Sequence, residues 1–478
     1  MPQEQELYDI AIIGGGPAGY TSAFEARKQG LSVVLFEKDK IGGVCLNKGC
    51  IPTKAILHSA ELYEEMKCAQ DLGISAENLS FDYEKIVEHK DKIVEKLRKN
   101  LELALKNAGV KVVYGEAEIS GKLKVESGKL NNSQLSTFNF QLDTDCSLFT
   151  VHCSQEKFLC KKLIIATGSE PKDFPTLRFD HEFVLNSDDI LNLKKLPKNI
   201  LIIGSGAIGI EWARIFSAFD VEVSIVETAE HLLPIADIEV SKRIERIFKS
   251  KKIKMYLSNT VEKIEPPLSK GGVCEADGGI LTAAIPSKQG KVYLKSGEIL
   301  EPECVLLAVG RKAVEISGKL KVESGKLNNS QLSTFNFQLV GDACGKIQLA
   351  HFAIKQAIKE VSGIDFEETL VPSVVYGNPE IAWVGKREQD LEEGTYQKSN
   401  LLISALGKSH CDNSTDGFIK ILSQDGKILG AHIVSKEASS LIQQITIAMQ
   451  NNLTIDDLKK VCFAHPTYSE GIFESLFK

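Results

Sequence analysis

The sequence contains one short supersecondary pattern twice, and this repetition constrains the fold more than any other feature. The first copy begins with the apolar residues 8–13, which run into the glycine-rich turn 14–19. Helix-forming residues follow, and a second apolar run at 31–36 ends at Glu37. This order of strand, turn, helix and strand predicts two parallel strands joined by a helical crossover.

The second copy keeps the same order and the same dimensions. Apolar residues 200–203 lead into the turn 204–209, and a second apolar run at 221–226 ends at Glu227. In both copies the first glycine and the closing glutamate are 23 residues apart. We therefore predict an α/β protein with two doubly wound, Rossmann-like domains.

Each glycine-rich turn suits the pyrophosphate of a dinucleotide. The first glycine permits the tight turn, the second lets backbone N–H groups approach the phosphates, and the third lets the helix pack closely. Glu37 and Glu227 stand where a carboxylate accepts hydrogen bonds from ribose hydroxyls. The glycines are Gly14, Gly16 and Gly19 in the first turn and Gly204, Gly206 and Gly209 in the second. One such turn also occurs in plain loops, but two with correctly spaced glutamates predict two dinucleotide sites.

Length and composition exclude several other classes of protein. The 478 residues predict about two to four domains. Hydrophobic residues make up 43% and charged residues 25%, which is typical of globular proteins and excludes disordered, collagenous and coiled-coil chains. No uncharged apolar run approaches the ~18 residues of a membrane span. The net charge is −7 and the basic residues are scattered, so nucleic acid is a poor candidate partner.

The cysteine content and the first residues indicate a reducing compartment. Eleven cysteines in a chain of this length fall far below the density of a disulfide scaffold, and the number is odd. The first ten residues have neither a basic region nor a long apolar stretch, so we expect no secretory signal. A cytoplasmic protein is expected, in which any disulfide is catalytic rather than structural.

Three other segments differ from the repeated pattern. Residues 82–108 carry apolar side chains at helical spacing among many charges, which predicts a helix packed on the surface. From about residue 371 to 478, strand-like runs with turns precede helices and predict a separate α+β domain. Residues 120–142 recur unchanged at 317–339. Two identical copies are not a solenoid, so a recent duplication and an error of sequence assembly are the two explanations.

Cys45 and Cys50 are the cysteines whose setting suggests chemistry. In a regular helix their Cα atoms would lie ~7.5 Å apart along the axis, and in a strand ~17 Å apart. A disulfide needs about 4.4–6.8 Å and therefore a distorted segment, which Gly49 and Pro52 permit. The residues after Cys50 predict a helix, whose N-terminus stabilises a thiolate. Two core cysteines without a disulfide are an equally good interpretation, whereas a metal site lacks its second pair of ligands.

His465 and Glu470 form the last candidate site. A functional interpretation makes His465 a general base that Glu470 orients and charges. Alternatively, Thr467 and Glu470 form a capping box for the final helix, and His465 is only a neighbour. On these residues alone the capping interpretation is the better one.

Together these motifs resemble the FAD-dependent pyridine nucleotide–disulfide oxidoreductase family over nearly the whole chain. Residues 42–55, GGVCLNKGCIPTKA, resemble the redox disulfide of that family, and residues 166–169 its ATG turn. Residues 307–311 resemble the strand that ends the NAD domain, and residues 341–343 with 349–351 a second FAD contact. VPSVVYGNPEIAWVG and HPTYSE resemble its dimerisation domain.

The resemblance implies roles for the candidate residues. Cys50 would be the thiolate facing the flavin, and Cys45 the thiol that exchanges with substrate. His465 would be the base that reaches the disulfide of the other subunit, with Glu470 holding its imidazole, and this outweighs the capping interpretation. Lys54 would pair with Glu211 near the flavin N5.

The resemblance also implies two sets of cofactor-binding residues and no metal. The FAD residues are Gly14, Gly16, Gly19, Glu37, Lys54, Ala117, Gly168, Asp342 and Ala350. The NAD residues are Gly204, Gly206, Gly209, Glu211, Glu227 and Gly310. NAD is favoured over NADP because residues 228–234 contain no arginine to meet a 2′-phosphate.

The implied activity is oxidation of a protein-bound dihydrolipoyl group with hydride transfer to NAD. The expected partners are a second copy of the chain and the lipoyl domain of a 2-oxo-acid dehydrogenase or glycine-cleavage complex. Another flavin disulfide reductase resembling glutathione reductase, and a defective non-enzymatic form, are the alternatives. The expected domains are 1–190 for FAD with the redox disulfide, 191–312 for NAD, 313–370 as a return segment and 371–478 for dimerisation. In the return segment the family continues with Pro-Asn after the arginine, where this chain has the second copy of the duplicated residues.

Overall fold

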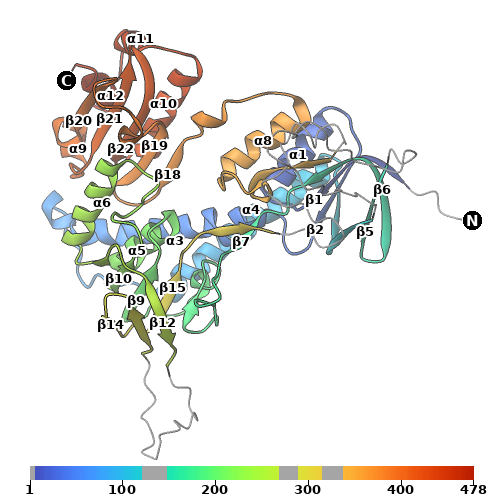
Figure 1. Cartoon of the computed structure of the whole chain (residues 1–478), viewed down its shortest axis with the longest axis horizontal. Helices are drawn as coiled ribbons and strands as arrows, with labels where there is room; N and C mark the ends of the chain where they lie inside the picture. The colour runs from blue at the N-terminus through green and yellow to red at the C-terminus, as the bar shows by residue number, and fades with distance from the viewer. Residues whose placement is uncertain (1–5, 121–147, 268–288, 315–336, 478) are drawn as a thin grey trace, which may run out of the picture. The chain divides into compact units, whose positions relative to one another are not determined.

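The computed structural model describes residues 6–120, 148–267, 289–314 and 337–477 (Figure 1). Most of the duplicated sequence, 121–142 and 317–336, lies outside these ranges. The chain forms two compact units. The first unit comprises Met1–Pro52, Asp91–Glu170 and Arg311–Phe366, and the second comprises Thr53–Lys90, Pro171–Gly310 and Glu367–Lys478.

The first unit contains a seven-stranded sheet of order β3-β2-β1-β6-β5-β4, in which β17 also pairs with β6. Its strands are β1 (Leu7–Ile13), β2 (Val33–Glu37), β3 (Lys111–Tyr114), β4 (Ala117–Ser120), β5 (Phe149–Cys153), β6 (Glu156–Ile165) and β17 (Phe337–Leu339). β1 is parallel to both β2 and β6, which confirms the expected crossover. All five residues of β2 are buried, as expected for a parallel strand covered on both faces.

Among its described residues, the first unit includes all or part of five helices, and β7 (Ser169–Pro171) pairs with β16 (Arg311–Ala313). The helices are α1 (Pro17–Lys28), α2 (Gly43–Lys48), α3 (Cys50–Lys67), α4 (Tyr83–Asn107) and α8 (Ala350–Ser362). α4 is the helix predicted at 82–108. α1 packs against α8, where the Gln29 amide donates a hydrogen bond to the Val361 carbonyl at 3.0 Å.

The second unit contains the second α/β pattern. Its parallel sheet has the order β11 (Lys254–Tyr256), β10 (Glu222–Val226), β9 (Asn199–Ile203), β15 (Cys304–Leu307) and β8 (Val184–Leu185). The helices α5 (Ala207–Ala218) and α6 (Ile238–Ser250) accompany it, and Trp212 and Phe216 of α5 are fully buried in its core. A small antiparallel sheet adds β12 (Val261–Glu265), β13 (Lys291–Leu294) and β14 (Ile299–Leu300).

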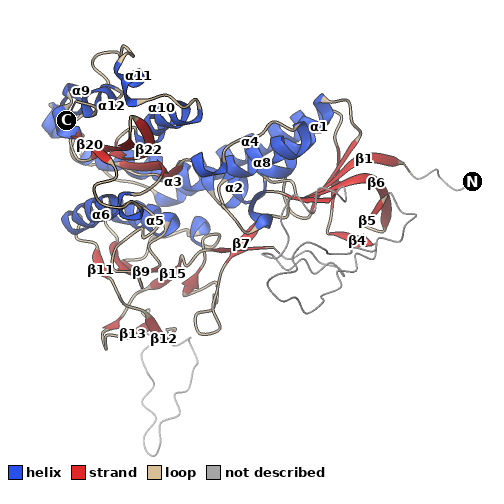
Figure 2. Cartoon of the chain, turned by 45° about the horizontal axis from the view of Figure 1, so that its top comes forward, coloured by secondary structure: helices blue, strands red, loops and turns tan. Residues whose placement is uncertain are grey.

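The C-terminal part of the second unit is an antiparallel sheet with helices, as the sequence predicts (Figure 2). The strand order is β18 (Ser373–Val375), β19 (Glu380–Gly385), β22 (Lys427–Ser435), β21 (Phe418–Gln424) and β20 (Gln397–Leu402). The helices are α9 (Gly407–Cys411), α10 (Ala438–Gln450), α11 (Ile455–Lys459) and α12 (Glu470–Ser475). α10 packs on β19 and β22. None of the described helices is both long and apolar enough to cross a bilayer.

β17 shows that the end of the second duplicated copy is structural. Its three residues are the last three of that copy, and they pair in parallel with Leu163–Ile165 of β6. Phe337 is 2% exposed and lies in one core with Phe36 and Phe158. The segment 337–339 therefore supplies the strand that leads to Gly341.

We predict that Phe337→Ala lowers the free energy of unfolding by about 3–5 kcal/mol, because it leaves a cavity beneath the sheet. Urea unfolding of the purified protein measures this change. Phe174→Ala is the control, because its side chain is 37% exposed and its loss should change stability little. Equal stability of the Phe337 variant and wild type would show that β17 adds nothing to the core.

Candidate functional site

The first glycine turn joins β1 to α1 through contacts that only glycine permits. Gly14 has φ +104°, and a Cβ there would lie 2.2 Å from the Ala166 carbonyl oxygen. A Cβ on Gly19 would lie 1.8 Å from the Gly14 carbonyl oxygen. Gly16 caps α1, so the first backbone N–H groups of that helix lie beside the turn. The turn thus offers backbone donors and a helix N-terminus to an anion.

Glu37 lies at the end of β2, beside the first turn. We call each glycine turn together with its glutamate, 14–19 with Glu37 and 204–209 with Glu227, a dinucleotide cradle. Its side chain is 8% exposed, and Oε2 accepts a hydrogen bond from the Gly15 N–H at 2.8 Å. Oε1 accepts one from the Asp39 N–H at 2.8 Å. Because each carboxylate oxygen has two lone pairs, both retain capacity to accept a hydroxyl hydrogen.

The second turn has the same construction in the second unit. Gly204 has φ +98°, and a Cβ on Gly209 would lie 2.1 Å from the Gly204 carbonyl oxygen. Gly206 differs, because its φ of −68° is ordinary and a Cβ there would meet no atom within 4 Å. The fold therefore does not require glycine at this position. The open space fits a ligand that approaches the backbone closely.

Glu227 is held by four hydrogen bonds at the end of β10. Oε2 accepts from the N–H and the hydroxyl of Ser205, at 2.8 and 2.7 Å. Oε1 accepts from the Thr228 hydroxyl at 3.0 Å and the Ala229 N–H at 2.9 Å. Burial raises the pKa of Glu227, but these bonds outweigh it and leave the pKa below its usual value. The carboxylate is thus ionised at neutral pH and suited to accept ribose hydroxyls. Sequence reasoning missed Ser205, although it lies inside the glycine motif.

The cysteine segment is broken at Gly49 and packs against the first turn. Cys45 lies in α2, and Cys50 is the first residue of α3. The two helices meet at Gly49, where a Cβ would lie 3.1 Å from the Val44 carbonyl oxygen. A side chain at position 49 would therefore crowd the backbone of α2. Both cysteines are half-buried.

Two glycines join this segment to the cradle. The Gly42 N–H donates to the Gly15 carbonyl at 2.8 Å, and a Cβ on Gly43 would lie 2.7 Å from Gly16 Cα. Tyr20 of α1 interacts electrostatically with both cysteines. Burial raises the pKa of its hydroxyl, and the charges of the two cysteines raise it further. The first unit therefore places two sulfur groups beside a dinucleotide cradle.

A second set of residues in the first unit meets around Asp342. Asp342 Oδ2 accepts a hydrogen bond from the Ser169 hydroxyl at 2.5 Å, and Arg311 Nε donates to Ser169 Oγ at 2.8 Å. Burial raises the pKa of Asp342, while Ser169 and Arg311 oppose this rise. Gly168, next to Ser169, has φ +77°. Ser169 and Arg311 lie in motifs that the sequence identified, but the hydrogen bonds that Ser169 makes with Arg311 and Asp342 are not visible in local spacing.

Three further predicted residues lie in different settings. Ala350 is the first residue of α8, so its N–H belongs to a helix N-terminus. Ala117 lies on β4, is 8% exposed and pairs with Cys153 of β5. Gly310 of the second unit has φ +104°, and its carbonyl accepts the Lys172 N–H at 3.0 Å.

Lys54 and Glu211 form a direct ion pair within the second unit. Lys54 Nζ lies 2.9 and 2.8 Å from the two oxygens of Glu211, whose residue is 5% exposed. The Tyr376 N–H donates to Glu211 Oε1 at 3.1 Å, and its ring centroid lies 4.5 Å from Lys54 Nζ. Tyr376 lies in the motif VPSVVYGNPEIAWVG, but the sequence did not predict a role for it at this ion pair. This arrangement fixes the Lys54 ammonium at one position.

His465 and Glu470 are in contact, and Glu470 also accepts a backbone hydrogen bond. His465 Nδ1 lies 2.7 Å from Glu470 Oε1, while Oε2 accepts the Thr467 N–H at 2.8 Å. Burial raises the pKa of Glu470, but these two partners outweigh it and lower the pKa. The carboxylate therefore stays ionised through the neutral range, and protonation disrupts the pair only as pH falls through this lowered pKa.

The expected capping box does not form in full. Ser469 is the residue that precedes α12, and the Thr467 hydroxyl donates to the Ala464 carbonyl at 2.7 Å rather than accepting from the helix. The interactions of Glu470 with His465 and Thr467 therefore coexist. The His465 side chain is 77% exposed, so its Nε2 can meet a group on another molecule.

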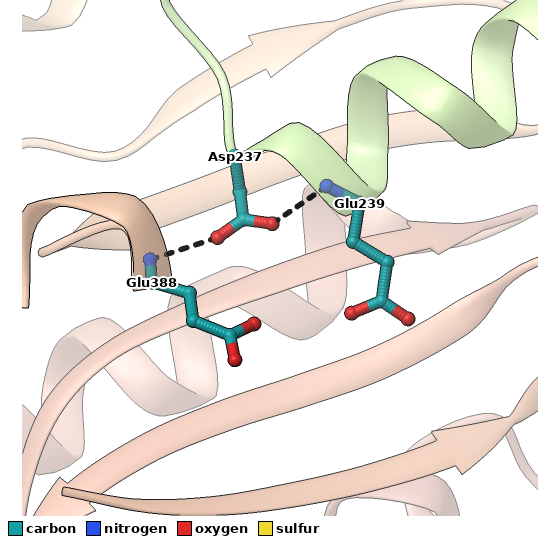
Figure 3. Close-up of side chains that lie close together, drawn as sticks. All are labelled: Asp237, Glu239 and Glu388. Atoms are coloured by element: carbon teal, nitrogen blue, oxygen red, sulfur yellow. Dashed lines mark hydrogen bonds between the residues drawn. The ribbon is translucent and has the colours of Figure 1, made fainter. Parts of the chain in front are cut away.

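Three acidic residues of the second unit approach one another as metal ligands do, namely Asp237, Glu239 and Glu388 (Figure 3). The ammonium of Lys420 lies 2.5, 3.1 and 2.8 Å from their respective oxygens. The Lys420 ammonium thus occupies the position that a metal ion would take among these carboxylates. This group is an internal ion cluster of the described residues.

The geometry is that of a protein with two dinucleotide sites and a pair of cysteines beside the first. Comparison with known proteins agrees with this class. Residues 8–357 match the family model described as pyridine nucleotide-disulphide oxidoreductase, and residues 371–476 match its dimerisation domain. The chain belongs to the pyridine nucleotide-disulphide oxidoreductase family. FAD and NAD are the cofactors of this enzyme class, and the two cradles fit two dinucleotides.

Curated relatives over nearly the whole chain carry one particular name, dihydrolipoyl dehydrogenase. The Zymomonas mobilis protein is 32% identical and the Bacillus subtilis protein 30% identical; each alignment covers 98% of this chain and 97% of the relative. The mitochondrial protein of Sus scrofa is 31% identical, with 98% of this chain and 89% of the relative covered.

Solved structures share the fold. LpdA from Mycobacterium tuberculosis has a TM-score of 0.84 at 21% identity, covering 98% of this chain and 99% of that one. The HOCl-induced flavoprotein disulfide reductase RclA from Escherichia coli has a TM-score of 0.78 at 24% identity, with the same coverage. These similarities confirm the architecture of two dinucleotide folds and a C-terminal domain.

Substitutions at Gly206 and Gly209 of the second turn are expected to have opposite effects. We expect Gly206→Ala to leave the melting temperature near that of wild type, because its Cβ meets no atom. The same Cβ should weaken NAD binding about ten-fold by filling the space the ligand approaches. Gly209→Ala should lower the melting temperature, because its Cβ overlaps the Gly204 carbonyl. Thermal unfolding and NAD titration measure both, and tight NAD binding by the Gly206 variant would contradict the assignment.

Proposed function

We propose that this protein is a dihydrolipoyl dehydrogenase, which oxidises a protein-bound dihydrolipoyl group and reduces NAD. The observation that carries the proposal is that the segment holding Cys45 and Cys50 packs on the first glycine turn through Gly42 and Gly43. The names of the full-length relatives support the same substrate.

The two cofactors divide between the two cradles in this proposal. Residues 1–190 and the return segment 313–370 serve FAD, through Gly14, Gly16, Gly19, Glu37, Ala117, Gly168, Asp342 and Ala350. Residues 191–312 serve NAD, through Gly204, Gly206, Gly209, Glu227 and Gly310. Glu227 and the absence of arginine from residues 228–234 favour NAD over NADP. Bound FAD supplies a two-electron acceptor for the dithiol and a hydride donor for NAD.

The cysteines carry the thiol chemistry. With the enzyme disulfide formed, a substrate thiolate attacks Cys45 Sγ, the Cys45–Cys50 bond breaks, and Cys50 leaves as a thiolate. The second substrate thiolate then attacks the substrate sulfur bound to Cys45, which releases the lipoyl disulfide and a Cys45 thiolate. Cys50 suits the role of leaving group because it opens α3, where the helix N-terminus stabilises negative charge.

His465 takes the proton of the attacking substrate thiol. Glu470 Oε1 accepts from His465 Nδ1–H, which leaves Nε2 as the base. Its exposure suits a base that acts on another molecule's site. In the homodimer, His465 of the partner subunit serves the disulfide of this chain. When FAD is bound, the Lys54 ammonium, which Glu211 holds in place, would interact with the flavin.

The partners follow from this chemistry. A second copy of the chain joins through the C-terminal domain, and the matched dimerisation model at 371–476 supports this. The substrate is the lipoyl domain of a 2-oxo-acid dehydrogenase or glycine-cleavage complex. The cysteine content is compatible with a cytoplasmic enzyme.

The test is formation of NADH from dihydrolipoamide by the purified, flavin-loaded dimer. We expect turnover with NAD and little oxidation of NADPH by glutathione disulfide. Activity only in the second assay would replace this proposal by a glutathione-reductase-like function. Protein that does not take up FAD would indicate a non-enzymatic form. Cys45→Ser should keep FAD but lose dihydrolipoamide turnover, whereas Cys411→Ser, an exposed cysteine of the second unit, should retain it.

Glu470→Gln tests the base. His465 and the Thr467 N–H contact different oxygens of Glu470, and a glutamine replaces one of these oxygens by an NH₂ group, which cannot accept. We expect kcat to fall by about ten-fold to a hundred-fold, with FAD content unchanged. Steady-state kinetics against pH measure the change.

Glu474→Gln is the matched control, because Glu474 lies on the same helix and makes no described side-chain contact with His465. A fall of equal size in both variants would indicate damage to α12. Unchanged kcat in the Glu470 variant would show that Glu470 does not orient or charge the base.

A further inference from the structure

We propose that Lys420 is a positioning residue for NAD: through Asp237 it holds the loop 233–237 against the second glycine turn. This inference rests on the proposed function, because it takes that turn as the NAD site. Lys420 lies on β21 of the C-terminal sheet, and Asp237 precedes α6 of the dinucleotide fold. All the residues involved belong to the second unit.

Lys420 is fully buried and surrounded by carboxylates. Its side chain and that of Asp237 are both 0% exposed, and their charged atoms lie 2.5 Å apart. Glu388 Oε2 lies 2.8 Å from the same Nζ. Without the ammonium, the buried carboxylate of Asp237 and the partly buried carboxylate of Glu388 would face each other without compensation, which is unfavourable. His432 adds a weaker contact, with Nε2 3.8 Å from Asp237.

Asp237 connects two separate segments of backbone (Figure 3). Its Oδ1 accepts the Glu239 N–H at 2.9 Å and so caps α6. Its Oδ2 accepts the Glu388 N–H at 2.9 Å. One carboxylate thus ties the start of α6 to the turn that follows β19, and Lys420 balances its charge.

The neighbours of Glu388 hold the same loop. Gln389 Nε2 donates to the Ala236 carbonyl at 3.0 Å, and its Oε1 accepts the Ile238 N–H at 3.3 Å. Arg387 Nη1 donates to the Pro234 carbonyl at 3.3 Å. The segment 387–389 therefore binds consecutive parts of the loop.

Leu233 transmits this restraint to the nucleotide turn. It is 0% exposed and has φ +50°, a conformation that costs free energy for a residue with a Cβ. Such a backbone persists only where the surroundings enforce it. Its N–H donates to the carbonyl and to Oγ of Ser205, at 3.1 and 3.2 Å.

Ser205 completes the connection to the ribose carboxylate. Its N–H and hydroxyl both bind Glu227 Oε2. Hydrogen bonds and a short turn of backbone thus join Lys420 to Glu227. When the loop is loosened, the orientation of Ser205 and Glu227 is lost, and with it NAD affinity.

The experiment compares Lys420→Met with Gln389→Ala in the flavin-loaded enzyme. Lys420→Met removes the charge but keeps the length of the side chain. Gln389→Ala removes two hydrogen bonds to the loop without leaving a buried charge, so it decides the question if the first variant does not fold. We expect KM for NAD to rise about five-fold or more in each, with kcat nearly unchanged.

Two measurements separate positioning from general damage. Flavin reduction by dihydrolipoamide without NAD, followed by absorbance, should keep the wild-type rate. Lys398→Met is the matched control, because Lys398 binds the same Glu388 at 2.8 Å but is half-exposed and makes no described contact with Asp237. Its KM for NAD should equal that of wild type.

The outcomes are distinct. An unchanged KM for NAD in Gln389→Ala and in any folded Lys420→Met protein would overturn the inference. So would an equal loss in the flavin-reduction step. A wild-type enzyme whose flavin is reduced by dihydrolipoamide but which forms no NADH would overturn the NAD assignment itself.

Discussion

Contact between the third glycine of each turn and the carbonyl of the first is the constraint on which both dinucleotide folds depend. Gly19 on Gly14 and Gly209 on Gly204 allow a helix to begin directly beside the strand that precedes it. The helix N-terminus then lies at the carboxyl edge of a parallel sheet, where anions bind in such folds. In the first unit the same turn also supports the cysteine segment through Gly42 and Gly43.

The sequence could predict features that depend on neighbours along the chain. Both strand–turn–helix units, the helix α4 and the helix that Cys50 begins follow from local spacing. It could not predict groups that meet only after folding, such as Ser169 with Asp342, or Leu233 with Ser205. Their side chains are ordinary in composition, and their importance comes from burial and from partners distant in sequence.

The His465 segment shows why one motif supported two interpretations. Glu470 has two oxygens, and the structure uses one for the imidazole and one for the backbone N–H of Thr467. The local spacing that indicated a cap and the resemblance that indicated a base describe different atoms of one carboxylate. A sequence pattern identifies the residue, whereas the structure shows which partner each of its oxygens contacts.

The order of the chain in the first unit has a consequence for synthesis. Its last segment, Arg311–Phe366, follows more than a hundred residues of the second unit. Until residues 337–342 leave the ribosome, β6 lacks β17, and Ser169 lacks Asp342. The parallel sheet of the second unit, which ends with β15, can close earlier because its strands are already made. Completion of the sheet of the first unit is therefore a late event in the synthesis of the chain, and an open strand edge persists until then.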